Sequence, residues 1–394
     1  MYDVADSRLD AFRAEAAAWI KANFPPALKG VNSTPYFTDG AYADADQNYQ
    51  LWLRRVVGHG WGAPTWPEEY GGAGMSAEEA AVINEEMAKA GGFHPNRTYG
   101  AWMLGPTLLE MGDEAQKRHF LPPIARGEVR WCQGFSEPGA GSDLASLQTK
   151  CVDAGDHWVV TGQKIWTSGA NHANWCFCLV RTDTSVKQRG ISFLLIDMSS
   201  PGIEARPIFL ISGSTHFCEV FFNDVKVPKE NMVGPVNGGW NVAKRLLQFE
   251  RDGLASGRTE HTSLATSAKD YVGVDAEGRI ADPDLRARIL RNDMRGRAYA
   301  LTLKRSKEAS ANGAGVPVSV LKNIGSDLAQ ERGELAVEIM GQNALGWEGE
   351  AYSADELDVT RQWLHSKAYS IYGGSFEIQH NITAKRVLGL PSQI

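Results

Sequence analysis

Long hydrophobic runs are missing from this chain. No stretch of about 18 apolar residues occurs in it, so we expect no transmembrane helix. The N-terminal stretch MYDVADSRLDAFRAEAAAWIKANF has no basic region followed by an apolar core, and its pattern is that of an amphipathic helix. We therefore expect no secretory signal and a cytoplasmic location.

Cysteine is also scarce. An odd number of cysteines at irregular spacing indicates neither a disulfide framework nor a zinc site. The five cysteines are Cys132, Cys151, Cys176, Cys178 and Cys218. Alternation along a strand would put Cys176 and Cys178 on one face, where we expect buried thiols in a protein from a reducing compartment.

An excess of basic residues is absent as well. The formal net charge is −7 and the pI is near 5.8, which disfavours nucleic acid as the main partner because phosphate binding needs a basic surface. The composition is 43% hydrophobic and 22% charged over 394 residues, which is enough chain for two or three domains with a large core.

The residue pattern changes twice along the chain. Residues 1–126 are predicted to be helical, with a capping box at Ser76 and Glu79, and with a helix near 112–128 that should stop at Pro122 and Pro123. Short runs rich in Val, Ile, Phe and Trp then predict a β-domain over 127–236. Residues 237–394 are again predicted to be helical, so the fold class is α+β in the order helical, β, helical.

A glycine-rich loop, SEPGAGSDLAS, occupies 136–146. It lacks the third glycine of a dinucleotide fingerprint and precedes strands, so a Rossmann fold is disfavoured. Two interpretations remain open. The loop is either a plain turn or a site that directs backbone N–H groups and the Ser136 and Ser142 hydroxyls toward a polar ligand.

A second stretch, GQKIWTSGANHANW, covers 162–175 and ends a predicted strand at Trp166, Thr167 and Ser168. A buried indole in the core is one interpretation of Trp166. The other is a platform for a planar cofactor, because an indole stacks on a flat ring while neighbouring hydroxyls bond to its heteroatoms.

Four stretches together closely resemble the acyl-CoA dehydrogenase family. They are WCQGFSEPGAGSDLASLQTK (131–150), GQKIWTSGANHANW (162–175), EVFFNDVKVPKENMVG (219–234) and IYGGSFEIQHNITAKRVLGLP (371–391). The match keeps its order over nearly the whole chain, and it is strongest to the large subunits of bacterial heteromeric enzymes such as pimeloyl-CoA dehydrogenase. The resemblance implies an N-terminal helical domain, a central β-barrel-like domain and a C-terminal four-helix bundle.

The resemblance also implies bound FAD and an acyl-CoA substrate. The enzyme would take the α-proton, pass the β-hydride to flavin N5, form a trans-2-enoyl-CoA and give its electrons to an electron-transfer flavoprotein. The implied cofactor-binding residues are Phe135, Ser136, Gly141, Trp166, Thr167, Ser168, Ser375 and Glu377. Ser142, Arg251 and Tyr372 are the implied substrate-binding residues.

The catalytic base is the main departure from the common family pattern. Most members carry a glutamate where this chain has Gly373, which keeps only the backbone N–H that would help to stabilise the enolate. Glu250 lies on the leucine side of a predicted helix, with Leu246, Leu247 and Leu254 at helical spacing. From the residues alone it could equally be half of a structural ion pair. Some members, such as isovaleryl-CoA dehydrogenase, carry the base on this helix before an arginine, so the resemblance assigns the base to Glu250.

Two family motifs that complete a neighbouring subunit's FAD site are missing. The arginine motif RxxFG does not occur near 269–289, and Glu338 replaces a glutamine. We therefore expect a related second subunit in an α2β2 assembly, with a homotetramer as the alternative. A flavin oxidase or monooxygenase of the same fold and a non-catalytic partner subunit are the alternative functions. Residues 93–109 are expected near the acyl tail, where Arg97 is either a carboxylate ligand or an ordinary surface arginine.

Overall fold

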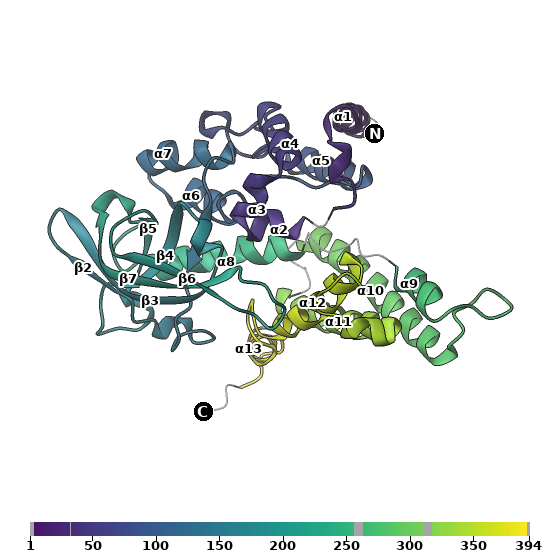
Figure 1. The fold of residues 1–394 in the computed structure, drawn as a ribbon. Coiled ribbons are helices and arrows are strands. Elements are labelled where there is room, and N and C mark those ends of the chain that lie inside the picture. The colour runs from purple at the N-terminus through teal and green to yellow at the C-terminus, as the bar shows by residue number, and fades with distance from the viewer. Residues whose placement is uncertain (1–3, 32, 256–262, 311–316, 392–394) are drawn as a thin grey trace. The chain divides into compact units, whose positions relative to one another are not determined.

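The computed structural model describes residues 4–31, 33–255, 263–310 and 317–391 (Figure 1). The chain forms two compact units. The first contains residues 1–208 and 215–250, and the second contains 209–214 and 251–394. Each unit is described separately below.

Helices fill the N-terminal part of the first unit (Figure 1). They are α1 (Val4–Asn23), α2 (Thr34–Thr38), α3 (Gly40–Ala45), α4 (Gln47–Gly58), α5 (Ala77–Lys89), α6 (Gly105–Met111) and α7 (Glu114–Ala125). The predicted capping box is confirmed at the start of α5, where Ser76 and Glu79 exchange backbone–side-chain hydrogen bonds of 2.8 and 3.1 Å. This bonding satisfies N–H groups that the first turn of a helix leaves without partners.

The prediction that Pro122 and Pro123 stop a helix is wrong, because α7 continues through both to Ala125. Both prolines lie near the C-terminal end of the helix. They leave the carbonyl groups of Arg118 and His119 without helical donors, and these two residues are exposed, so water can take the place of the missing N–H groups.

The β-part is one strongly curled sheet. Its strands are β1 (Trp131–Gly134), β2 (Lys150–Asp153), β3 (His157–Ser168), β4 (Trp175–Arg181), β5 (Ile191–Asp197), β6 (Ile203–Ile208) and β7 (Phe217–Pro228). The strand order is β1-β4-β2-β3-β7-β6, and β5 pairs with β4. Strands β3 and β7, which lie side by side in Figure 1, form the longest antiparallel pairing. Strand β1 runs parallel to β4.

Strand β4 is buried on both faces, and its side chains enter two different cores. Phe177 and Leu179 belong to the core shared with α6, α7 and α8 (Gly239–Ala255). Cys176 and Cys178 belong to the core on the other face, which confirms the prediction of buried thiols on one side of a strand. The alternation follows from the period of two in a strand.

The second unit is helical. Its helices are α9 (Leu264–Tyr271), α10 (Pro283–Ser310), α11 (Val318–Met340), α12 (Ala354–Ser366) and α13 (Phe376–Ile382). Leu264, Ile289 and Leu335 lie in one hydrophobic core that joins α9, α10 and α11. In Figure 1, α11 and α12 run beside each other, and the two helices are in contact.

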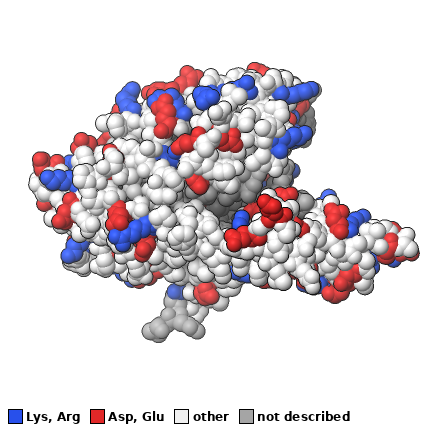
Figure 2. All heavy atoms as spheres, viewed as in Figure 1, with Lys and Arg blue, Asp and Glu red and all other residues white. Residues whose placement is uncertain are grey.

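Within the described ranges, no helix combines the length and the apolar character that crossing a membrane requires. On the face shown in Figure 2, Lys and Arg side chains lie interspersed with Asp and Glu side chains. Neither sign of charge forms one broad patch on that face, which fits a surface of mixed charge rather than a basic groove.

The burial of the thiols leads to a first prediction. All five cysteines are buried, and burial raises the pKa of Cys178 and Cys218 and raises that of Cys151 to about 12. We expect the native protein at pH 8 to react slowly with Ellman's reagent, because the reactive species is the thiolate. In guanidinium all five thiols should react at once. Rapid reaction of several thiols in the native protein would contradict this account.

Candidate active site

A β-bulge interrupts the pairing of β3 with β7 close to the end of β3. The register shifts between Lys164 and Thr167, and Trp166 at the bulge has a positive φ of 61°. A left-handed backbone is strained for a bulky residue and is often found at functional positions. The bulge turns the indole outward, so Trp166 is 54% exposed and its ring contacts Phe217 edge-on. The structure therefore presents a flat aromatic surface at the strand end.

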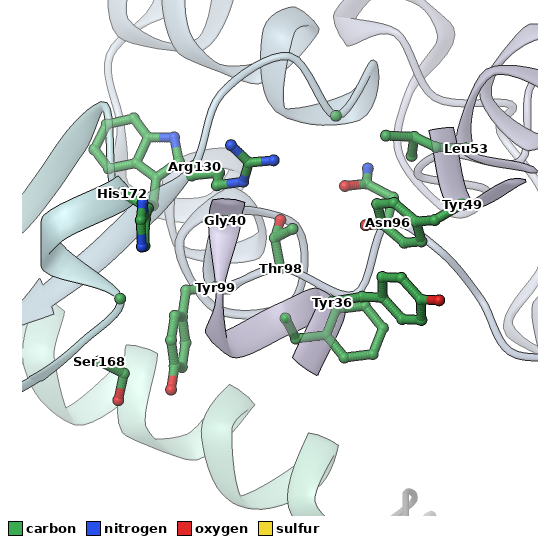
Figure 3. A pocket seen from close by; sticks show the side chains of 14 residues that line it. Tyr36, Gly40, Tyr49, Leu53, Asn96, Thr98, Tyr99, Arg130, Ser168 and His172 are labelled. Atoms are coloured by element: carbon green, nitrogen blue, oxygen red, sulfur yellow. The ribbon is translucent and has the colours of Figure 1, made fainter. Parts of the chain in front are cut away.

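The two residues after Trp166 carry hydroxyl groups. The Thr167 Oγ1 atom is buried, and among the described residues it has no hydrogen-bond partner. A buried polar atom without a partner costs free energy unless a ligand or water satisfies it. Ser168 is half-buried, and its side chain hydrogen-bonds with Tyr99. Figure 3 shows the hydroxyl groups of Ser168 and Tyr99 at the same side of one cavity.

Glu250 interacts electrostatically with Tyr99. The pKa of Tyr99 is raised above its ordinary value by burial, lowered by the Ser168 hydrogen bond, and raised again by the Glu250 carboxylate. Such an effect requires the carboxylate to be close to the phenol. Glu250 is on α8, which Leu246 anchors in the core of the first unit. Tyr99 thus interacts with the Ser168 side chain at the end of β3 and with the Glu250 carboxylate on α8.

The glycine-rich loop is tied to β3 by a buried ion pair. The Lys164 ammonium donates to the Glu137 carboxylate over 2.8 Å and to the Phe135 carbonyl over 3.2 Å. Lys164 is fully buried and the Glu137 side chain is 8% exposed. Glu137 also accepts the backbone N–H groups of Gln148 and Thr149, so one carboxylate closes the loop on itself.

Each end of the loop has a different environment. The Ser136 carbonyl accepts the Ile165 N–H over 2.9 Å, which joins the loop to the bulged strand. Phe135 points into the core between Phe177 and Phe193, so its peptide group rather than its ring faces the loop. Gly141 and Ser142 at the tip are exposed.

The candidate residues of the second unit surround the start of α13. Ser375 caps this helix by accepting the Ile378 N–H over 3.4 Å, and Glu377 is exposed in its first turn. Gly373 has a φ of +65°, and no described atom would lie within 4 Å of a Cβ added there. The Gly373 carbonyl accepts the Gln379 side chain over 2.8 Å, while Tyr372 is 39% exposed.

Arg251 and Glu338 are two further positions that the sequence singled out. The side chain of Arg251 lies outside the described residues. Glu338, which replaces the family's glutamine, forms a two-pronged ion pair with Arg288, with both N–O distances 2.6 Å. Its carboxylate oxygens are therefore engaged within the same unit.

Comparison with known proteins identifies the family. The acyl-CoA dehydrogenase N-terminal domain matches residues 8–128, the middle domain matches 132–225, and the C-terminal domain matches 237–388. This chain belongs to the acyl-CoA dehydrogenase family. It is an oxidoreductase that acts on acyl-CoA, and it has the three-part acyl-CoA dehydrogenase fold that the sequence predicted.

Several relatives match over nearly the full length of this acyl-CoA dehydrogenase. Acyl-CoA dehydrogenase IpdE1 of Mycobacterium tuberculosis is 36% identical, and the match covers 98% of both chains. A solved structure titled Tcur3481-Tcur3483 steroid ACAD superimposes with a TM-score of 0.79 at 28% identity and covers 98% of both chains. The ChsE4-ChsE5 complex from Mycobacterium tuberculosis gives 0.75 at 28% identity, again with 98% of both chains covered.

The sequence did not single out three residues of the candidate site, namely Tyr99, Lys164 and Glu137. Tyr99 lies within the segment expected near the acyl tail, but its hydrogen bond to Ser168 joins positions far apart in the chain. Lys164 and Glu137 lie inside the two quoted motifs. No clear signal for the buried pair was present in the sequence, because other polar residues occur in the strand that carries Lys164. They are Thr161, Gln163 and Thr167.

The buried pair gives a stability prediction. Replacing Glu137 by Gln leaves the Lys164 ammonium buried without a counter-charge, and we expect a loss of about 3–5 kcal/mol in the free energy of unfolding. A surface control, Glu204→Gln, breaks only the exposed pair with Arg206 and should cost less than about 1 kcal/mol. Denaturant unfolding followed by circular dichroism measures both.

The pH dependence follows from the direction of the Glu137 shift. Burial raises the pKa of this carboxyl, but the charge and hydrogen bond of Lys164, together with the hydrogen bonds from Thr149 and Gln148, outweigh burial and hold it below its ordinary value. A lowered folded-state pKa stabilises the protein above the unfolded value, about 4.3, and this stabilisation disappears as pH falls through the folded value. The difference between wild type and Glu137→Gln should therefore shrink in acid. A difference that is constant down to pH 3 would contradict the ionic account.

Proposed function

We propose that this protein is an FAD-dependent acyl-CoA dehydrogenase in which Glu250 is the catalytic base. It would convert an acyl-CoA thioester into the trans-2-enoyl-CoA. The observation that supports this proposal is that the Glu250 carboxylate acts on the pKa of Tyr99, whose side chain hydrogen-bonds with Ser168. Ser168 lies at the end of the strand where Trp166 is turned outward.

The chain's residues fit a flavin. The exposed indole of Trp166 offers a stacking surface, and Thr167 has a buried hydroxyl that lacks a partner among the described residues. Trp166, Thr167 and Ser168 would hold the ring together with Ser136 and the backbone of Phe135 and Gly141. Ser375 and Glu377 would contact the pyrophosphate and ribose. Bound FAD would supply the acceptor for the β-hydride.

The proton chemistry would belong to Glu250. Its side chain is half-buried on α8, and a positioned carboxylate can take a proton from a substrate carbon. The Tyr99 hydroxyl would orient Ser168, and Gly373 would offer its N–H to the developing enolate. Arg251, Ser142 and Tyr372 would contact the substrate.

The test of the base is Glu250→Gln. This change keeps the size of the side chain but removes its ability to take a proton, so the rate of flavin reduction by acyl-CoA should fall by about 10²–10⁴-fold. Stopped-flow absorbance at the flavin band measures this rate. The matched control is Glu128→Gln, which alters an exposed carboxylate paired with Arg126 and should leave the rate unchanged.

Retention of flavin is the internal check on this test. If Glu250→Gln keeps its FAD and still reduces it at the wild-type rate, Glu250 is not the base. If reduced wild-type enzyme reacts rapidly with oxygen, the oxidase or monooxygenase alternative is supported. Slow reaction with oxygen and fast reaction with an electron-transfer flavoprotein would support the dehydrogenase.

We also propose that a related second subunit completes the FAD sites in an α2β2 assembly. The Glu338 carboxylate is engaged with Arg288 and offers no donor to a phosphate. Helix α10 exposes Leu290, Met294 and Leu301, which are 58, 64 and 66% exposed and lie four and seven residues apart. An exposed apolar stripe at helical spacing fits contact with another helix. Two of the similar solved structures have titles that name two components.

Flavin content tests the assembly. The chain expressed alone should purify with much less than one FAD per chain, because half of each site would be missing. Co-expression with a related subunit should restore flavin to a stoichiometry of two FAD per four chains. Absorbance of released flavin and light-scattering mass measure both quantities. One firmly bound FAD per chain in a homotetramer would refute the proposal.

A further inference from the structure

A small cavity lies inside the first unit, next to the proposed active site (Figure 3). Its volume is about 40 Å³, and its lining includes Tyr99 and Ser168 at one side. Tyr36 and Tyr49 form an aromatic wall on another side, with their rings stacked 4.5 Å apart. The cavity therefore adjoins the Tyr99 and Ser168 hydroxyls of the proposed active site.

Two polar atoms in the cavity lining have no partner among the described residues. They are the Oδ1 atom of Asn96, a residue that is only 2% exposed, and the Nε1 atom of Trp131, a residue that is 3% exposed. The amide nitrogen of Asn96 donates to the carbonyls of Gly62, Ile124 and Ala125 at 2.9–3.3 Å, which fixes which end of the amide faces inward. In Figure 3 this side chain points toward the side of the cavity that Thr98 and Arg130 form.

The other strong polar groups of the lining already have partners. The Arg130 guanidinium forms two hydrogen bonds with Asp44, of 2.6 and 3.0 Å. The hydroxyl of Tyr36 donates to Asp46 over 2.5 Å, and that of Tyr49 donates to the Pro95 carbonyl over 2.9 Å. The cavity therefore offers one acceptor, Asn96 Oδ1, and one N–H donor, Trp131 Nε1, that lack partners among the described residues, while its guanidinium group is paired with Asp44.

We propose that this cavity binds a hydroxyl group carried by the acyl part of the substrate, with Asn96 Oδ1 as its acceptor. This inference rests on the proposed dehydrogenase function and names its substrate class, a hydroxylated cyclic acyl-CoA. A carboxylate is disfavoured because it has no hydrogen to donate to Asn96 Oδ1 and would bring two acceptor oxygens to a lining with one unpartnered N–H group among the described residues. An unsubstituted ring is disfavoured because it would leave Asn96 Oδ1 without a hydrogen bond. The aromatic wall suits the edge of a ring, and about 40 Å³ suits a single substituent.

Three matched thioesters test the proposal. They are 3-cyclohexylpropanoyl-CoA and its ring-hydroxylated and ring-carboxylated derivatives, each with the substituent at position 3 or 4. The flavin-loaded protein is used, with its partner subunit if one is required. We expect at least one hydroxylated isomer to exceed the parent about 10-fold in kcat/KM, and every carboxylated isomer to fall below the parent.

Binding without turnover gives a second readout. Dissociation constants are measured from the flavin spectrum of the Glu250→Gln protein, and the same order of preference is expected there. Asn96→Ala should abolish the preference for hydroxyl. Because this change also removes three structural hydrogen bonds, its folding is compared with that of Asn84→Ala, which loses one exposed bond. Should Asn96→Ala fail to fold, the wild-type comparison still decides.

The outcomes separate two failures. If the parent ester reduces the flavin but no hydroxylated isomer is preferred, the cavity holds only water and this inference is overturned while the dehydrogenase proposal stands. If none of the esters, and no straight-chain acyl-CoA, binds or reduces the flavin, the proposed function itself fails. A preference for a carboxylated isomer would overturn the assignment of the ligand class.

Discussion

The buried ion pair between Lys164 and Glu137 is the constraint on which the candidate site depends. It joins two motifs that lie apart in the sequence, because Lys164 belongs to the strand that carries Trp166 and Glu137 belongs to the glycine-rich loop. The same ammonium holds the Phe135 carbonyl, and the same carboxylate holds two N–H groups on the far side of the loop. A charge removed from water requires such complete bonding, and complete bonding leaves the loop little freedom. The rigid placement of Ser136 and Trp166 follows from this bonding.

The sequence predicted the fold well because its signals were local and repeated. The period-two pattern of β4 and the capping box of α5 both appear in the structure, and the three family domains follow one another in the predicted order. The prolines of α7 misled the prediction because proline is excluded from a helix interior but tolerated where the affected carbonyls face water. A local rule could not show on which side those carbonyls would lie.

Single candidate residues of the site could be proposed from the sequence, but the contacts between distant segments could not. Glu250, Ser168 and Trp166 were identified from the sequence, but Tyr99 was not, because its role depends on a contact between a loop and a strand end about 70 residues away. The positive φ of Trp166 was equally invisible, since a bulge depends on how two strands pair rather than on either strand alone. The amide of Asn96 resembled any polar residue until the carbonyls around it were in place.

The bonding of Asn96 also bears on how substrate preference can change in evolution. Its nitrogen supports the carbonyls of three residues from two separate segments, so almost any substitution at 96 removes support from the fold before it alters recognition. Descendants that change the acyl group they accept would instead vary the walls. Gly40 is one such place, since a Cβ there would meet the His172 side chain at 2.6 Å and intrude on the space. Substrate specificity would then change through substitutions in the cavity walls while the Asn96 acceptor stays in place. Asn96 would be retained even in relatives that no longer use it to bind a ligand.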